Sequence, residues 1–137
     1  MKKGITAGNF DVLHPGYIKM FKEAKQHCDW LIVALQGDPT IERPHKMKPI
    51  LTPEEREEAL LSLKYVDEII HYNTEAELDI VFQNSGAEIR FLGDDYKGKP
   101  SNRPWLNMEV YYTDRSHGWS TTKFKKLIAN EVNMDVQ

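Results

Sequence analysis

The chain has 137 residues, 40% of them hydrophobic, and a formal net charge of -3 at pH 7. This length and composition predict one compact domain with a real core, and they leave too little chain for two ordinary domains. The charge balance provides no general basic surface, so nucleic acid and membranes are not expected as partners. Any phosphate must therefore be bound by a local arrangement of residues.

Cysteine content and apolar runs indicate the compartment. The single cysteine, Cys28, cannot form an internal disulfide, and at the end of an apolar helical pattern it is expected to be a buried structural thiol. No apolar run approaches the length of a bilayer span, and the N-terminus lacks the apolar core of a secretory signal. We therefore expect a cytoplasmic protein.

The first part of the chain alternates strand and helix patterns. Ile5 to Ala7 is typical of a strand that ends at Gly8, and apolar residues at helical spacing predict a helix from Gly16 to His27. The continuously apolar run Trp30 to Leu35 predicts a central strand of a parallel sheet that is covered on both faces. The polar, proline-rich segment from Gln36 to Leu51 predicts an irregular loop.

Two capping boxes predict where the next helices begin. Thr52 with Glu55 forms the first box, with Pro53 in the first helical turn, and Thr74 with Glu77 forms the second. In such a box the hydroxyl accepts one backbone N–H while the glutamate accepts another. We therefore expect helices directly after Thr52 and Thr74.

Three further strands and a last helix complete the pattern. Val66 to Ile70, Ile89 to Leu92 and Val110 to Thr113 are typical of strands, and the helix before the second of these should stop at Gly86. Ser120 leads into a closing amphipathic helix.

The alternation predicts an α/β fold: a single Rossmann-like domain with an open, mostly parallel sheet of about five strands and helices on both faces. We expect the domain to span residues 1–130, with a flexible tail at 131–137. In such sheets, ligands bind beyond the carboxyl ends of the strands, near the point where strand order reverses. Gly8, Asp38, Gly93 and Arg115 all follow predicted strands.

The segment Gly8 to Gly16 is a candidate phosphate site. Free N–H groups in the first turn of the helix could hold a phosphate, with His14 as an added donor and Gly16 allowing close approach to the backbone. Asp11 could hold a divalent ion on a triphosphate or orient a neighbouring side chain. An ordinary strand-to-helix turn, with His14 at the surface, explains the spacing equally well.

The segment Arg115 to Thr122 is a second candidate anion site, because it combines a guanidinium with hydroxyls at a helix N-terminus. The alternative is that Ser120 only caps the last helix and Arg115 only forms a surface salt bridge. That alternative accounts for Ser120 but not for the whole cluster.

Four basic residues between these segments are further candidates. Lys46 and Lys48 lie in the predicted loop and could close over a substrate, although most such lysines are solvated. Arg56 and Lys64 fall on one predicted helix, too far apart to face one phosphate unless the ligand is extended. We expect one of these two at the solvated surface.

Covalent catalysis is not indicated. The sequence contains no Cys and His cluster with metal-ligand spacing, no nucleophile elbow and no P-loop motif. What remains is in-line attack on a phosphorus, with cations neutralising the charge that develops on a pyrophosphate leaving group.

Several motifs together resemble the glycerol-3-phosphate cytidylyltransferases, a branch of the HxGH nucleotidyltransferases. They are Lys2 to Asp11, His14-Pro15-Gly16, Lys46-Met47-Lys48, Tyr65 to Glu68, Gly93 to Tyr96 and Arg115 to Thr122, in the family's order over nearly the whole chain. The resemblance implies a Rossmann-like fold, a homodimer, Mg²⁺, and transfer of CMP from CTP to sn-glycerol 3-phosphate, giving CDP-glycerol and pyrophosphate.

The resemblance also implies roles for single residues. His14, Lys46 and Arg115 would be catalytic through the phosphates, and Asp11 would lie beside the metal and the acceptor. The implied nucleotide-binding positions are Gly8, Asn9, Phe10, His14, Gly16, Gly93, Asp94, Arg115, Ser116, Ser120 and Thr121, and the substrate-binding positions are Asp11, Lys46, Lys48 and Lys64.

The chain departs from this family at Tyr17, where the HxGH motif has its second histidine. A tyrosine hydroxyl can hydrogen-bond a phosphate, but at neutral pH it cannot supply a cationic donor. We count Tyr17 among the catalytic positions and expect a rate lower by about one to two powers of ten. Because both candidate segments should face one cleft, we hypothesise that His117 supplies the imidazole missing at Tyr17.

The acceptor is open at this stage. Tyr96, Trp105 and Trp119 could shape a pocket for another substrate, such as phosphoethanolamine, phosphocholine or a sugar phosphate, or they could pack in the core or a dimer interface. ATP in place of CTP is a further alternative, as is a CTP-binding protein with weakened turnover.

Overall fold

The computed structural model describes residues 1–101 and 103–135. The strands are β1 (Lys3–Gly8), β2 (Trp30–Gln36), β3 (Glu68–Tyr72), β4 (Ile89–Gly93) and β5 (Glu109–Thr113). The helices are α1 (Pro15–Lys25), α2 (Pro53–Leu61), α3 (Glu75–Asn84) and α4 (Thr121–Asp135), with one 3-10 turn, η1 (Asp94–Tyr96). Strands and helices alternate along this part of the chain, as predicted.

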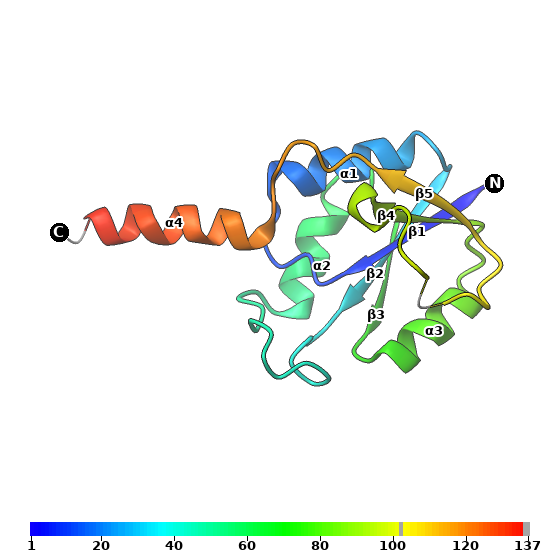
Figure 1. Ribbon diagram of the computed structural model, residues 1–137, viewed down its shortest axis with the longest axis horizontal. Coiled ribbons are helices and arrows are strands. Elements are labelled where there is room, and N and C mark those ends of the chain that lie inside the picture. The colour runs from blue at the N-terminus through cyan, green and yellow to red at the C-terminus, as the bar shows by residue number, and fades with distance from the viewer. Residues whose placement is uncertain (102, 136–137) are drawn as a thin grey trace.

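The five strands form one parallel sheet in the order β3-β2-β1-β4-β5 (Figure 1). The apolar strand β2 lies inside the sheet, paired with β1 on one side and with β3 on the other. The predicted α/β class with an open parallel sheet is therefore confirmed.

Helices cover both faces of this sheet. Successive side chains in a strand point to opposite faces. In β2 the odd-numbered residues from 31 to 35 join a core cluster with Phe21 of α1 and Leu60 of α2. Ile32 and Ala34 join a second cluster with residues of α3. The two clusters account for the continuous apolar run in β2, which packs on both of its faces.

Strand order reverses at β1, because β2 and β3 lie on one side of it and β4 and β5 on the other. The carboxyl ends of parallel strands meet at the same edge of a sheet, and the crevice at such a reversal is the usual ligand site. β1 ends at Gly8, β4 at Gly93 and β5 at Thr113. The segments that follow these strands therefore meet at one edge.

The capping signals locate the helix starts. The hydroxyl of Thr52 accepts the Glu55 N–H at 3.1 Å, and the Glu55 carboxylate accepts the Thr52 N–H at 2.9 Å, so the first capping box is confirmed. The hydroxyl of Thr74 accepts the Glu77 N–H at 3.2 Å, but the Glu77 carboxylate accepts the N–H of Asn73 instead of Thr74. The second cap is confirmed without the reciprocal bond of a box.

Two predicted boundaries need correction. β3 begins at Glu68 and not at Val66. Just before it, the Asp67 N–H donates to the Leu31 carbonyl at 3.0 Å, and the Asp67 carboxylate accepts the Leu31 N–H at 2.8 Å. Helix α2 ends at Leu61, with Ser62 as its C-cap.

Lys64 therefore lies beyond α2, and the expectation that Arg56 and Lys64 share one helix is wrong.

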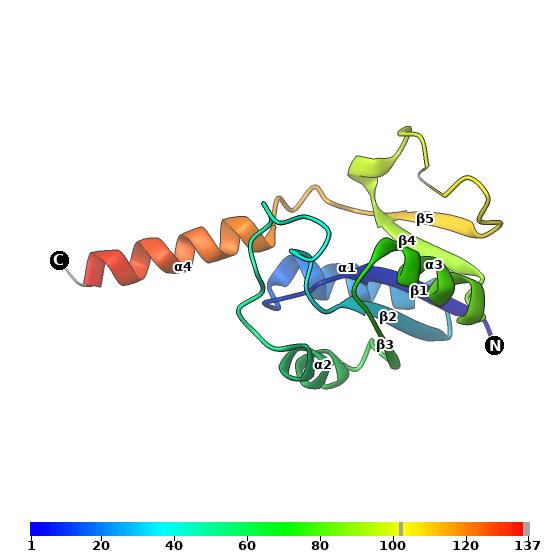
Figure 2. The same cartoon turned by 90° about the horizontal axis from the view of Figure 1, so that it is seen from below.

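Helix α4 projects away from the sheet and the other helices (Figure 1; Figure 2). It includes residues 131–135 of the segment expected to be a flexible tail, and residues 136 and 137 lie outside the described residues. Its apolar side chains Leu127, Ile128, Val132 and Met134 are exposed. No helix in the described part of the chain is long and apolar enough to cross a membrane.

Candidate active site

A cavity of about 450 Å³ lies at the edge of the sheet where the strands end. Predicted site residues from both ends of the chain line it: Gly8, Asn9, Phe10, Asp11, His14, Gly16, Tyr17, Lys46, Gly93, Arg115, Ser120 and Thr121. The two candidate anion segments therefore form one site, although about a hundred residues of sequence separate them.

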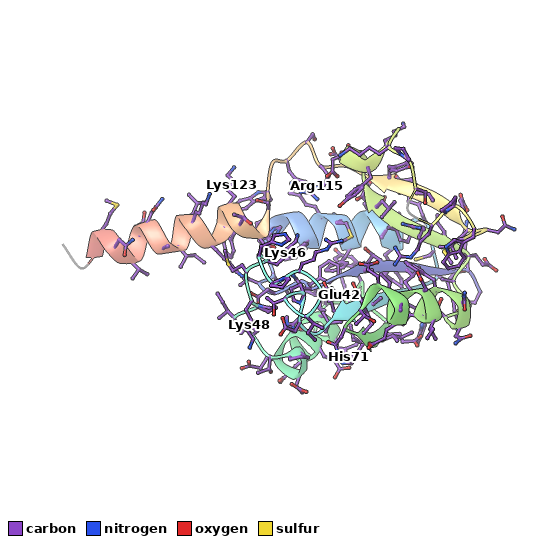
Figure 3. All side chains as sticks on the ribbon, turned by 60° about the horizontal axis from the view of Figure 1, so that its bottom comes forward. Glu42, Lys46, Lys48, His71, Arg115 and Lys123 are labelled. Carbon is purple, nitrogen blue, oxygen red and sulfur yellow. The ribbon has the colours of Figure 1, made fainter. Side chains whose placement is uncertain are left out.

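Four predicted positions lie outside this lining. Lys48, Lys64 and Asp94 are exposed, and the hydroxyl of Ser116 donates to the carboxylate of Asp114 at 3.0 Å. Figure 3 shows Lys48 farther from Arg115 than Lys46 is, in the direction of α2. Of the two loop lysines, Lys46 alone lines the cavity.

Phe10 shapes the loop that follows β1. Its φ of 43° is in the left-handed region, which is unusual for a residue with a side chain. Its buried ring packs edge-on against Tyr17, with ring centroids 5.0 Å apart, and against Phe21 at 5.3 Å. Backbone strain of this kind persists only where the surrounding packing enforces it. The loop is thus held in place by its own aromatic side chain.

Arg56 of α2 ties this loop to its neighbours. Its side chain is 1% exposed and donates to the backbone carbonyls of Asn9, Gln36, Gly37 and Leu51 at 2.6–3.1 Å. The planar guanidinium can satisfy several acceptors at once, which compensates its removal from water. Arg56 is therefore neither solvated nor a phosphate ligand: it positions the cavity's backbone.

His14 is the N-cap of α1. Its Nδ1 accepts the Gly16 N–H at 3.1 Å, and its carbonyl accepts the N–H groups of Tyr17 and Ile18. Pro15 has no N–H to offer. The first-turn amides of α1 are thus already bonded within the helix, so the expectation that these N–H groups are free is wrong. At this helix start, the group left for a ligand is the histidine ring.

The other ring nitrogen of His14 is an unpaired donor. Because Nδ1 accepts a backbone N–H, the neutral ring carries its proton on Nε2. Nε2 is buried and has no hydrogen-bond partner among the described residues. Burial, together with the charges of His117 and Arg115, lowers the pKa of His14. His14 is 3% exposed, which rules out the surface alternative. Because its pKa is lowered, the ring is an uncharged donor at neutral pH.

Tyr17 joins α1 to α4. Its hydroxyl is hydrogen-bonded to the hydroxyl of Thr121 at 2.6 Å, and its ring stacks on His14 with centroids 4.0 Å apart. Burial raises the pKa of Tyr17, so the phenol stays protonated at neutral pH. Tyr17 thus supports the His14 ring and holds the start of α4.

Asp11 is the centre of a buried cluster. Its carboxylate accepts the N–H groups of Ile50 and Leu51 at 2.8 and 2.9 Å and pairs with the Lys125 ammonium at 2.6 Å. Burial by itself would raise the pKa of Asp11, but these hydrogen bonds together bring it below its usual value. Sequence reasoning missed Lys125. Its position one helical turn after Thr121 was the signal that could have found it.

The surroundings of Asp11 test whether the protein itself could hold the expected Mg²⁺. Both carboxylate oxygens of Asp11 already have strong partners. Among the described residues, no group of three His, Cys, Asp or Glu side chains is arranged to hold a metal. Protein-bound Mg²⁺ commonly uses one or two carboxylates plus substrate phosphates and water. The donor set of the described residues therefore does not fit a resident magnesium site.

Gly93 and Arg115 fit against each other at the end of β4. A Cβ on Gly93 would lie 3.0 Å from Cγ and 3.2 Å from Cδ of Arg115, closer than an ordinary contact. The glycine therefore allows the arginine stem to cross the end of the strand. Both residues line the cavity, and the guanidinium gives it a permanent positive charge.

His117 lies at the same cavity as His14, as expected for two segments that face one cleft. A Cβ on Gly16 would lie 2.9 Å from Cε1 of each histidine ring and 2.7 Å from Cβ of Trp119. Gly16 is therefore required by the close packing of both imidazoles around it.

Two of the three aromatic candidates for the acceptor pocket reach the cavity. Tyr96 and Trp119 line it, whereas Trp105 is 50% exposed and lies outside the lining. The rings of Trp119 and His14 are nearly parallel, with centroids 6.2 Å apart. Trp119 thus borders the site rather than the core.

The parallel sheet and the cation-lined cavity at its reversal point define a Rossmann-like α/β protein that binds a nucleotide or a similar phosphate. A family model described as "Cytidylyltransferase-like" matches residues 5–127. The chain therefore belongs to the cytidylyltransferase-like family.

Comparison with curated relatives indicates which members of this family the chain is similar to. The chain is 39% identical over 133 residues to a glycerol-3-phosphate cytidylyltransferase of Bacillus subtilis (strain 168), covering 94% of this chain and 98% of that protein. It is 34% identical to the Staphylococcus aureus protein of the same name, covering 92% and 94%. It is also 40% identical over 110 residues to an FAD synthase of Ferroglobus placidus, covering 80% and 68%. The resemblance to glycerol-3-phosphate cytidylyltransferases is confirmed.

Solved structures support the fold. A lipopolysaccharide core biosynthesis protein from Thermoplasma volcanium aligns with a TM-score of 0.64 at 27% identity, covering 80% of this chain and 93% of that chain. Pantothenate synthetase from Thermus thermophilus aligns with a TM-score of 0.61 at 14% identity, covering 92% and 64%. The second likeness concerns the fold alone.

Proposed function

We propose that the chain is a glycerol-3-phosphate cytidylyltransferase, which transfers CMP from CTP to sn-glycerol 3-phosphate and releases CDP-glycerol and pyrophosphate. The observation that carries this proposal is the buried Nε2 of the cavity residue His14, which lacks a partner among the residues described. A buried, unpaired donor is costly unless a ligand supplies the acceptor. Relatives of that name, similar over more than nine-tenths of the chain, support CTP and glycerol 3-phosphate as the substrates.

The proposed reaction is an in-line displacement at the α-phosphorus of CTP. A phosphate oxygen of glycerol 3-phosphate forms the new P–O bond, while the bond to the β-phosphate breaks and its electron pair leaves with pyrophosphate. Because the acceptor phosphate is already ionised near neutral pH, the step requires no general base. The protein's contribution is positioning and charge stabilisation.

Three cavity residues supply that stabilisation. His14 donates its Nε2–H to an oxygen on the α-phosphorus, where negative charge grows as the bonds exchange. Lys46 and Arg115 line the same cavity and neutralise the departing pyrophosphate. Lys46 belongs to an exposed loop, which can close after the substrates bind.

The remaining lining residues bind the nucleotide in this proposal. Gly8, Asn9 and Phe10 present backbone groups at the end of β1, and Ser120 and Thr121 present hydroxyls at the start of α4. Lys48, Lys64, Asp94 and Ser116 lie outside the cavity lining, and we assign them no contact.

We propose that Mg²⁺ enters as its complex with CTP and belongs to the substrate. Triphosphate oxygens and water are ligands that Mg²⁺ prefers, and they require no further carboxylate from the protein. The saturated carboxylate of Asp11 supports this assignment. Asp11 then serves to hold the loop before α2 and to anchor α4.

We also propose that two copies of the chain associate and that the protein works in the cytoplasm. The projecting part of α4 carries exposed Leu127, Ile128, Val132 and Met134, which would be covered in a dimer. The buried free thiol of Cys28 is compatible with a reducing compartment.

Pyrophosphate release from CTP and from ATP, each with a panel of phospho-alcohols, tests the activity. The panel holds glycerol 3-phosphate, phosphoethanolamine, phosphocholine and a sugar phosphate, and FMN is added because an FAD synthase is similar in sequence. We expect release with CTP and glycerol 3-phosphate well above every other pair. Release with another acceptor would reassign the substrate, and CTP binding without release would leave only a nucleotide-binding protein.

A further inference from the structure

Two histidines from opposite ends of the chain flank one glycine. Cε1 of His14 and Cε1 of His117 would each lie 2.9 Å from a Cβ on Gly16. Both rings line the cavity. Because the two contact points share one position, the rings lie close enough to contact one small ligand.

The two rings make the same local hydrogen bond. Nδ1 of His14 accepts the N–H of Gly16 at 3.1 Å, and Nδ1 of His117 accepts the N–H of Trp119 at 3.0 Å. Each bond joins a side chain to the amide two residues further on. A backbone N–H can only donate, so each neutral ring carries its proton on Nε2.

Both Nε2 atoms are buried and lack a hydrogen-bond partner in the described part of the chain. A buried donor without an acceptor loses the hydrogen bonds that it had with water, and native structures rarely tolerate this. Two such donors beside one glycine, at a cavity that also holds Arg115 and Lys46, favour an anionic ligand. A polyphosphate offers several oxygens and can accept from both rings.

We propose that His117 is a second phosphate-binding histidine of this site, which donates its Nε2–H to the triphosphate that His14 also contacts. This inference rests on the proposed function, because it names a further residue that contacts the CTP phosphates. The ring of His117 then does for the leaving phosphates what His14 does for the α-phosphate.

Tyr17 does not compete for this role. Its hydroxyl is engaged with the Thr121 hydroxyl at 2.6 Å, and its ring is stacked on His14. A phosphate would have to break the bond with Thr121 to use the phenol. The imidazole of His117 has a donor ready without any such exchange.

A matched pair of variants separates binding from the structural bond to Trp119. His117→Asn keeps a side-chain oxygen that can accept the amide two residues on, but it removes the distal ring donor. His117→Ala removes both. We expect kcat/KM for pyrophosphate release to fall about 10- to 100-fold in His117→Asn, with an unchanged melting temperature. His71→Asn, at an exposed histidine outside the cavity, is the control and should match the wild type.

A titration with inorganic pyrophosphate tests contact directly and does not depend on turnover. Imidazole ¹⁵N signals are followed by NMR in the wild type and in His117→Asn. We expect the Nε2 signals of His14 and His117 to shift with one saturation curve, and His117→Asn to bind pyrophosphate about tenfold more weakly.

His117 signals that stay constant, or a His117→Asn variant with wild-type kcat/KM, would overturn the inference. Failure of the proposed function would give a different result: the imidazole signals of His14 and His117 would both shift with pyrophosphate, but the wild type would make no CDP-glycerol.

Discussion

The ammonium of Lys125 lies 2.6 Å from the carboxylate of Asp11, which links the projecting helix α4 to the loop after β1. The same carboxylate accepts the N–H groups of Ile50 and Leu51, just before α2. Lys125 also lies 3.7 Å from the sulfur of Met47, beside the loop that carries Lys46. Three segments that line the cavity thus meet at one buried ion pair.

Breaking this pair should lower the protein's stability. Asp11→Asn leaves the ammonium of Lys125, which is 15% exposed, without a counter-charge. We expect the free energy of unfolding to fall by about 3 kcal/mol, measured by urea denaturation. Lys126→Met, at an exposed neighbour on the same helix, is the control. An Asp11→Asn variant as stable as this control would show that the pair does not anchor α4.

Arg56 should be irreplaceable by lysine. An ammonium cannot reach the four carbonyls that the guanidinium bonds, so Arg56→Lys leaves buried acceptors unpaired. We expect a loss of about 3 kcal/mol in unfolding free energy and weaker CTP binding in calorimetry. Glu58→Gln, on the exposed side of α2, should change neither quantity. Normal CTP binding by Arg56→Lys would argue against a positioning role.

A methyl group at Gly16 should damage the site more than the fold. Its Cβ would lie within 2.9 Å of both histidine rings, so the rings must move apart. We expect Gly16→Ala to lose about 1–3 kcal/mol of stability and to bind CTP at least tenfold more weakly. Gly98→Ala is the comparison, because its φ of 82° disfavours a side chain, but among the described residues no atom beyond its chain neighbours lies within 4 Å of the added Cβ. Equal CTP binding by the two variants would mean that the rings are not packed around Gly16.

Stability should fall on mild acidification because of His14. Burial lowers its pKa below the ordinary value of 6.5, whereas the unfolded chain regains that value. The unfolded state therefore binds more protons as pH falls through 6.5 toward the lowered pKa, and the folded state loses stability in that window. Urea denaturation at about pH 7.5 and about pH 5.5 should show a larger loss in the wild type than in His14→Asn. Equal losses of stability in the wild type and in His14→Asn would contradict a lowered pKa at His14.

Charge on the exposed face of α4 should prevent association. Ile128→Glu with Val132→Glu places carboxylates four residues apart, on one face of the helix, where both wild-type side chains are about half exposed. We expect light scattering to give a dimer mass for the wild type and a monomer mass for the double variant. A wild type that is monomeric at all concentrations would remove the proposed dimer.

Much of the fold could be predicted from the sequence because its signals are local. The apolar run of β2 and the Thr52 cap depend on neighbouring residues, and both are as expected. The end of α2 was misplaced, since the apolar pattern continues past Leu61 while the chain turns at Ser62. The alternation of strands and helices also predicted an open, mostly parallel sheet, whereas the strand order β3-β2-β1-β4-β5 is known only from the structure.

The site was only partly predictable. His14 and Arg115 stand out because their residue types and neighbours are typical of phosphate binding. Arg56 and Lys125 do not, because their partners are backbone carbonyls or a carboxylate far away in the sequence. The expectation of free amides at the start of α1 was wrong for a related reason. The His14 side chain accepts the Gly16 N–H, and this hydrogen bond forms only when the loop is folded.

The central claim is tested most directly by ³¹P NMR of the protein with CTP, sn-glycerol 3-phosphate and Mg²⁺. The account predicts that pyrophosphate and the diphosphate of CDP-glycerol appear in equal amounts, and that His14→Asn, which can keep the N-cap bond but lacks the Nε2 donor, slows both together. Pyrophosphate without CDP-glycerol, or a His14→Asn variant as fast as the wild type, would contradict it.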